Sequence, residues 1–193
     1  MRHLHYDMGR RSFLAHTASL AMVATASSVV RARGKTSDEG KKPDDGLQWH
    51  DVRDWGVEGK GFNDTESDFD RLPARAKGVV RDAVWNLSRH SAGMMVRFRT
   101  NATSIHADYG VTSSNLAMPH MPATGVSGID LYALDTDAKW KWVAVTQPKE
   151  QQMKLKVVSE LDEGTHDFAA YLPLYNGTTH LKIGVPRDAT FEP

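Results

Sequence analysis

Short runs in which apolar and polar residues alternate recur along this chain, and this pattern most constrains its fold. An apolar residue at every second position gives a β-strand one apolar face, which must be buried against another layer. Turn-forming residues such as Gly, Asp and Asn separate the runs. The clearest runs are Met94–Phe98, Ile105–Tyr109, Met153–Val157, Phe168–Leu174 and Leu181–Val185.

Three further segments are predicted strands, namely Val84–Ser88, Ser127–Asp135 and Trp140–Thr146, for a total of about eight. Strands of this kind, each with one buried face, favour antiparallel sheets packed face to face. We therefore predict an all-β fold, an antiparallel β-sandwich of the jelly-roll type. Residues 66–82 are interrupted by Pro73 and Gly78 and predict a loop with one short helix.

Three turn signals indicate how the strands are joined. Asp135–Asp137, Asp162–Gly164 and Asn176-Gly177 each stand between two predicted strands. Asn-Gly is a strong signal for a tight reversal between antiparallel strands. We predict a hairpin turn at Asp162–Gly164 and a hairpin-like reversal at Asn176-Gly177.

The N-terminal region has the pattern of an export signal. Arg10 and Arg11 precede Phe13-Leu14 and a weakly apolar run over residues 15–30, which is typical of a twin-arginine leader. We expect a twin-arginine signal peptide at residues 1–33 and a flexible linker at 34–47. The sandwich then spans 48–186, and 187–193 is a linker stub. Such a protein is exported to the periplasm or the cell exterior.

Composition limits the partners and the chemistry. Lys plus Arg equals Asp plus Glu at 24 each, so no net charge attracts nucleic acid or anionic lipid. No segment after the leader approaches the ~20 apolar residues of a membrane span. The chain has no cysteine, which excludes disulfides and thiol catalysis. We expect no cofactor and no metal site.

No catalytic motif is recognisable. Ser127 lies in Gly125-Val126-Ser127-Gly128, where the second glycine comes one place too early for a nucleophile elbow. Asp162 and His166 are spaced as in a turn between strands. We therefore assign no catalytic residue to this chain.

Gly128-Ile129-Asp130-Leu131-Tyr132 resembles the hallmark of one known family. This is the N-terminal domain of a group of SGNH-type hydrolases and esterases, named after its Gly-x-Asp-Leu-Tyr stretch. The resemblance extends from about Trp49 to Pro186. It includes Arg71–Pro73, Val84–Ser88, Ser91–Gly93, Met118–Pro122 and Leu172–Asn176.

The resemblance implies a non-catalytic β-sandwich that precedes an SGNH catalytic domain, which we expect to be missing from this chain. The complete enzyme would hydrolyse an ester, such as acetyl groups on a polysaccharide. Two alternatives stay open. The chain could be a free-standing carbohydrate-binding module, or a weak hydrolase with unrecognised catalytic residues.

The candidate binding or docking residues are Asp130, Tyr132, His120, Trp140 and Trp142. Asp130 is expected either to fix the Met118–Gly125 loop, which contains His120, or to lie at the surface that docks the catalytic domain. Trp140 and Trp142 share one strand face. Burial in the core is the expected arrangement for them, and an exposed platform for sugar rings is the alternative.

Overall fold

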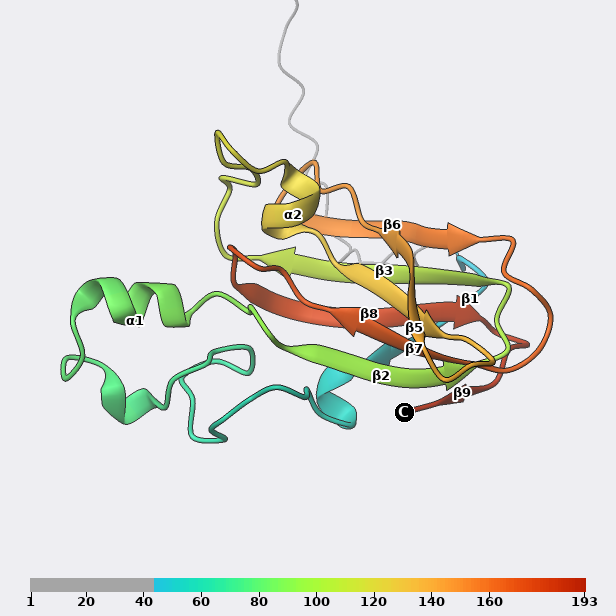
Figure 1. The fold of residues 1–193 in the computed structure, drawn as a ribbon, viewed down its shortest axis with the longest axis horizontal. Helices are drawn as coiled ribbons and strands as arrows, with labels where there is room; N and C mark the ends of the chain where they lie inside the picture. Colours follow the sequence, from blue (N-terminus) through green and yellow to red (C-terminus); the bar gives the residue numbers. More distant parts are fainter. Residues whose placement is uncertain (1–43) are drawn as a thin grey trace, which may run out of the picture. The chain divides into compact units, whose positions relative to one another are not determined.

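The computed structural model describes residues 44–193, which form two antiparallel sheets packed face to face (Figure 1). The predicted signal peptide and most of the predicted linker lie outside the described residues. The strands are β1 (Leu47–Asp51), β2 (Met95–Thr100), β3 (Ser104–Val111), β4 (Asp130–Leu134), β5 (Trp140–Val145), β6 (Gln152–Ser159), β7 (His166–Tyr171), β8 (Thr178–Pro186) and β9 (Phe191–Glu192).

The strand order confirms the predicted jelly-roll sandwich. One sheet has the order β1-β8-β3-β6, and the other has the order β5-β4-β7-β2-β9. Every pairing is antiparallel. Apart from the β4–β5 connection, successive strands cross from one sheet to the other, as in a jelly roll.

The alternating runs supply the core between the sheets. Val96, Phe98, Tyr109 and Leu181 are each at most 2% exposed, which confirms their predicted inward orientation. The hydroxyl of Tyr109, on β3, lies 2.7 Å from the Thr146 hydroxyl beyond β5 and so links the two layers. Burial raises the pKa of Tyr109 to about 12. Leu174 was predicted to continue the apolar face of Phe168–Leu174, but it lies beyond the end of β7 and is exposed.

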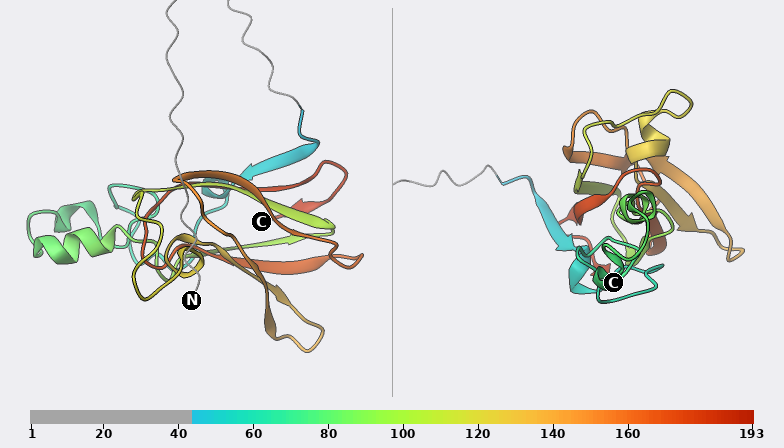
Figure 2. Two further views of the ribbon diagram at one scale, coloured as in Figure 1. Left: turned by 90° about the horizontal axis from the view of Figure 1, so that it is seen from above. Right: turned by 90° about the vertical axis from the view of Figure 1, so that its left-hand side faces the viewer.

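The predicted strand at Val84–Ser88 is wrong, because this segment is helical. Helix α1 spans Asp82–Ser88, and Asp82 lies in its first turn, where a carboxylate stabilises the positive end of the helix. The helix belongs to a segment, residues 60–90, that projects beyond one end of the sandwich (Figures 1 and 2). Within residues 44–193, this segment pairs with no strand of either sheet. The 3-10 helices are η1 (Val52–Asp54) and η2 (Ala74–Ala76).

Neither of the two predicted hairpins is present, whereas the turn signal at Asp135–Asp137 joins β4 to β5, which are neighbours. Asp162–Gly164 joins β6 to β7, and Asn176-Gly177 joins β7 to β8, and in both cases the two strands lie in different sheets. These turns therefore carry the chain across the sandwich. The sequence correctly predicted turns at these positions. Which strands pair with one another is determined by packing over the whole domain.

Ordered structure extends beyond both expected edges of the sandwich. On the N-terminal side, the Asp44 carboxylate accepts a hydrogen bond from Arg187 at 2.6 Å, and β1 begins at Leu47. On the C-terminal side, β9 lies within the expected linker stub and pairs with β2, with Phe191 opposite Thr100. None of the helices described within residues 44–193 is long and apolar enough to span a membrane.

Candidate functional site

The outer face of the five-stranded sheet brings together four of the five candidate residues. Asp130 and Tyr132 alternate along β4 with Leu131, which is buried in the core, so their side chains point outward. Tyr132 pairs with Trp142 on the neighbouring strand β5, after a β-bulge between Leu131 and Tyr132. Leu134 and Trp140 form the next pair on the same face.

Trp140 and Trp142 are exposed, and their predicted burial in the core is wrong. Their side chains are 42% and 57% exposed, respectively. β5 is the edge strand of its sheet. In the β4–β5 hairpin, Leu131 is buried in the core, and Val143 and Ala133 pack against it. Figure 2 shows this hairpin reaching away from the body of the sandwich. The alternation of β5 is as predicted, but its apolar face points to solvent.

Asp130 holds one of these tryptophans in place. The Nε1 atom of Trp142 donates a hydrogen bond of 3.1 Å to an Asp130 carboxylate oxygen. Tyr132 packs edge-to-face against Tyr171 of β7, with ring centroids 5.5 Å apart. The aromatic rings on this face are therefore oriented by neighbours within the sheet.

A groove of about 860 Å³ continues across the same face. It runs past Trp140 and Leu134 towards two arginines of β2. Arg97 donates two hydrogen bonds to Glu58, at 2.7 and 2.8 Å, and Arg99 donates two to Asp167, at 2.7 and 3.0 Å.

The charges of these arginines are neutralised within the groove. The hydrogen bond from Arg99 lowers the pKa of Asp167, and the hydrogen bond to Glu58 raises the pKa of Arg97. Each arginine therefore has its charge balanced by a neighbouring carboxylate. The groove thus combines aromatic rings with paired ionic groups, and Glu192, which also lines it, adds a further carboxylate.

The fifth candidate, His120, is not on this face. It is exposed in the turn between Met118 and Met121, ahead of helix α2 (Ala123–Ser127). Asp130 was expected to fix this loop, but the only side-chain partner of its carboxylate in residues 44–193 is Trp142. The loop is held by Ser127 instead, whose hydroxyl donates to the Leu116 carbonyl at 3.0 Å.

Asn176 connects the segments on either side of this loop, and sequence analysis missed it as a structural residue. Its side chain is buried, and its Nδ2 atom donates to Ser113 O at 3.1 Å and to Ser127 Oγ at 3.0 Å. Its Oδ1 atom accepts from Ser113 N at 2.9 Å and from Thr112 Oγ1 at 3.1 Å. The Asn-Gly dipeptide was the available signal, but it was interpreted as a turn only.

Ser127 has no access to a substrate. It is fully buried, and its hydroxyl already donates to Leu116 O and accepts from Asn176. A nucleophilic serine needs a base within hydrogen-bonding reach, and both partners here are poor bases. Within residues 44–193, no group of three or more His, Cys, Asp or Glu side chains could hold a metal ion.

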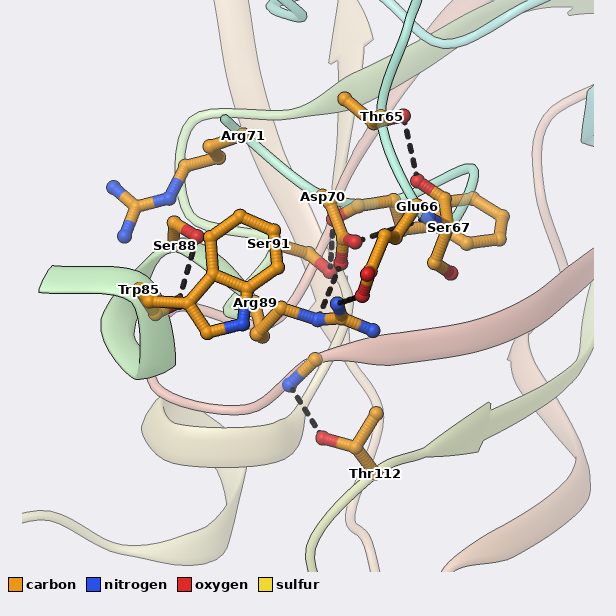
Figure 3. A network of polar contacts seen from close by, with 12 residues as sticks. Thr65, Glu66, Ser67, Asp70, Arg71, Trp85, Ser88, Arg89, Ser91 and Thr112 are labelled. Carbon is orange, nitrogen blue, oxygen red and sulfur yellow. Dashed lines mark hydrogen bonds and ion pairs between the residues drawn. The ribbon is translucent and has the colours of Figure 1, made fainter. Parts of the chain in front are cut away.

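The projecting segment, residues 60–90, is held together by an ion-pair network (Figure 3). Arg89 contacts Glu66 at 2.6 Å and Asp70 at 3.1 Å, and Glu66 also pairs with Lys77 at 2.8 Å. Burial raises the pKa of Asp70, while the charge of Arg89 opposes this shift. These pairs connect parts of the segment far apart in sequence, so pattern reasoning did not find them.

A family model described as GxDLY, the N-terminus of SGNH-hydrolase-type esterases, matches residues 47–191. The chain belongs to this family. The Gly-x-Asp-Leu-Tyr residues of the name are Gly128 to Tyr132, and the structure places them on the entry to β4 and on β4 itself.

Two solved structures are similar to this GxDLY domain. A GDSL-like lipase from Bacteroides ovatus ATCC 8483 is 26% identical with a TM-score of 0.69, and the match covers 76% of this chain and 42% of the lipase. The salicylyl-acyltransferase SsfX3 from a tetracycline biosynthetic pathway is 16% identical with a TM-score of 0.48, and the match covers 78% of this chain and 40% of the acyltransferase. The chain thus spans less than half of either structure. No curated protein matches it.

Proposed function

We propose that this chain is the accessory domain of an exported SGNH-family esterase. It packs against the catalytic domain, which performs the hydrolysis, and it shapes the approach of the substrate. The proposed substrate is an ester on a polysaccharide, such as an acetyl group. The family membership supports the accessory role, and the short share of the solved lipase that the chain matches supports a separate catalytic domain.

The observation that carries the proposal is a set of uncovered apolar side chains at one end of the sandwich. Val79 and Leu87 of the projecting segment are 80% and 54% exposed. Leu174 and Tyr175 are also exposed, and the backbone joins their loop to the base of the segment through a hydrogen bond from Ser91 N to Asn176 O of 3.1 Å. Several exposed apolar side chains on connected segments at one end of a domain support an interaction surface there.

The ion pairs of the projecting segment fit a docking role. Arg89 fixes Glu66 and Asp70, so the segment is ordered before any partner binds. A preordered surface loses less conformational entropy on association. Each Å² of this exposed apolar surface that docking removes from water contributes roughly 25 cal/mol to the free energy of binding.

Binding to a separately produced catalytic domain tests the proposal. The matching partner is the portion of the Bacteroides ovatus GDSL-like lipase that this chain does not match, which we expect to be its catalytic domain. Calorimetry should detect a complex that Leu87→Asp weakens at least about tenfold, since a buried unpaired carboxylate is costly. Trp142→Asp introduces the same charge on the sheet face and is the matched control. Absence of a complex, or equal sensitivity to both variants, contradicts the proposal.

We also propose export through the twin-arginine pathway, on the pattern of residues 10–14. Replacing both Arg10 and Arg11 by Lys keeps the charge and removes the pattern. The variant should accumulate in the cytoplasm of a bacterial host, while the unaltered chain is exported. Unchanged export of the variant would count against this pathway.

A further inference from the structure

The outer face of the five-stranded sheet has the chemistry of a sugar-binding surface rather than of a closed pocket. Trp142 and Tyr171 are both exposed, on strands separated by β4. The C–H faces of pyranose rings pack on aromatic side chains, whose apolar bodies and polar tips suit surfaces that are partly wet. Large aromatic side chains would otherwise favour burial, each by roughly 1.5–3 kcal/mol.

The rings are also oriented before any ligand binds. The hydrogen bond from Trp142 to Asp130 restrains the indole, and the edge-to-face contact with Tyr132 restrains Tyr171. Restraint of this kind lowers the entropy lost on binding.

The adjoining groove supplies polar groups for hydroxyls. Glu58 and Asp167 keep oxygens with free acceptor capacity after binding Arg97 and Arg99, because each carboxylate has about four acceptor sites. Both arginines are matched by a carboxylate, and Glu192 adds a further one, so the groove offers no excess positive charge to an acidic ligand. Among polysaccharides, the charge of the groove therefore disfavours acidic ones.

The edge of this sheet is poorly suited to a protein strand. Lys139 and Lys141 flank Trp140 on and beside β5, and a bulge interrupts the β4–β5 ladder. Lysines and bulges at sheet edges oppose pairing with further strands. The groove is also partly open to solvent, which allows a polymer to extend beyond it.

We propose that the outer face of the five-stranded sheet binds a neutral polysaccharide, with Trp142, Tyr171 and Trp140 stacking on sugar rings. The paired side chains of the groove hydrogen-bond to the hydroxyls of the same chain. The inference rests on the proposed function for one point only, namely that this polysaccharide carries the ester. The binding surface is separate from the projecting segment, so the domain would hold both the catalytic domain and the substrate.

Titration of the full chain with xylan, followed by calorimetry and tryptophan fluorescence, tests this inference without the catalytic domain. Trp142→Ala should weaken binding at least about tenfold, and Trp142→Phe should restore part of it, since the phenyl ring keeps a stacking surface. Tyr171→Ala should weaken binding, while Tyr175→Ala should leave it unchanged. The two tyrosines are matched in exposure, at 41% and 43%, but Tyr175 lies at the docking end.

Salt dependence separates the possible ligands. Binding of neutral xylan should change little between about 0.05 and 0.5 M salt, because no net charge is involved. Absence of binding to xylan and to chitin oligosaccharides overturns the inference, as does binding that Trp142→Ala leaves intact. Loss of the complex with the catalytic domain on Trp142→Ala also overturns it, since the face would then be a protein interface. Failure of the Leu87→Asp test alone affects only the proposed function.

Discussion

The indole of Trp142 and the carboxylate of Asp130 are joined by a hydrogen bond of 3.1 Å between neighbouring strands. The acid of the Gly-x-Asp-Leu-Tyr stretch thus orients an exposed aromatic ring. This gives the family motif a role on the outer face of the sheet, where the candidate residues gather. Asp130 is a positioning residue for that ring.

Substitution of Asp130 should loosen the ring without unfolding the domain. In Asp130→Ala the Trp142 indole loses its partner, and stability should fall by about 0.5–1.5 kcal/mol, as for a partly exposed hydrogen bond. The affinity for xylan should fall because the ring is no longer preoriented, and Asp130→Asn should restore much of it through the amide oxygen. Calorimetry and urea unfolding measure the two effects. An affinity unchanged in Asp130→Ala would contradict the positioning role.

Substitution of Asn176 should destabilise the domain strongly. Asn176→Ala leaves Ser113 N and Ser127 Oγ without their partner in a buried site, and each such group costs about 1–3 kcal/mol. We expect a loss of roughly 2–4 kcal/mol in urea unfolding. Asn115→Ala, at an exposed position, should change stability by less than about 0.5 kcal/mol. Similar values for the two variants would show that the Asn176 network is not structural.

Gly177 should not tolerate a side chain. A Cβ atom there would lie 2.4 Å from Arg89 O and 2.8 Å from Thr112 Oγ1. Gly177→Ala should therefore lower the melting temperature and cost about 1–3 kcal/mol. Gly61→Ala is the control, because a Cβ there meets no atom within 4 Å. Equal melting temperatures for the two variants would contradict the close approach at Gly177.

Acid should lower the stability of the domain partly by protonating Asp51. The hydrogen bond from Arg53 lowers the pKa of Asp51 to about 2, below its ordinary value of 3.8. Between these two pKa values the folded state binds fewer protons than the unfolded state. The stabilisation that Asp51 provides is therefore complete above pH 3.8 and is lost as the pH falls towards 2.

Unfolding free energies of the wild type and Asp51→Asn, measured from pH 5 to pH 2, test this expectation. The difference between them should be roughly 0.5–1 kcal/mol above pH 4 and should shrink towards pH 2. Asp162→Asn, at an exposed carboxylate, is the control. A difference that stays constant with pH would exclude the Asp51 pair as its source.

Local patterns predicted most of the strands and their buried faces. They did not predict features that depend on residues far apart in the sequence. The alternation in Ile105–Tyr109 and Leu181–Val185 identified the core because period-two burial is a local property. The exposure of Trp142 could not be predicted, because it depends on β5 being an edge strand whose outer face is left exposed by the elements described in residues 44–193. The helix at Asp82–Ser88 was missed because its segment lies beyond the reach of either sheet.

The candidate site was predictable in part. Asp130, Tyr132, Trp140 and Trp142 came from the motif and from strand alternation, and the structure gathers them on one face. Arg97 and Arg99 were recognised only as the polar face of a strand. Their pairing with Glu58 and Asp167 depends on contacts 39 and 68 residues apart, for which the sequence holds no local signal.

The most direct test of the accessory role is the hydrolysis of acetylated xylan and p-nitrophenyl acetate by the purified chain, with and without an SGNH catalytic domain of the same family. An accessory role predicts no turnover above the spontaneous rate for the chain alone. It predicts faster release of acetate from the polysaccharide when the chain is added to the catalytic domain. Turnover by the chain alone, or a catalytic domain whose rate on the polysaccharide is indifferent to the chain, would contradict it.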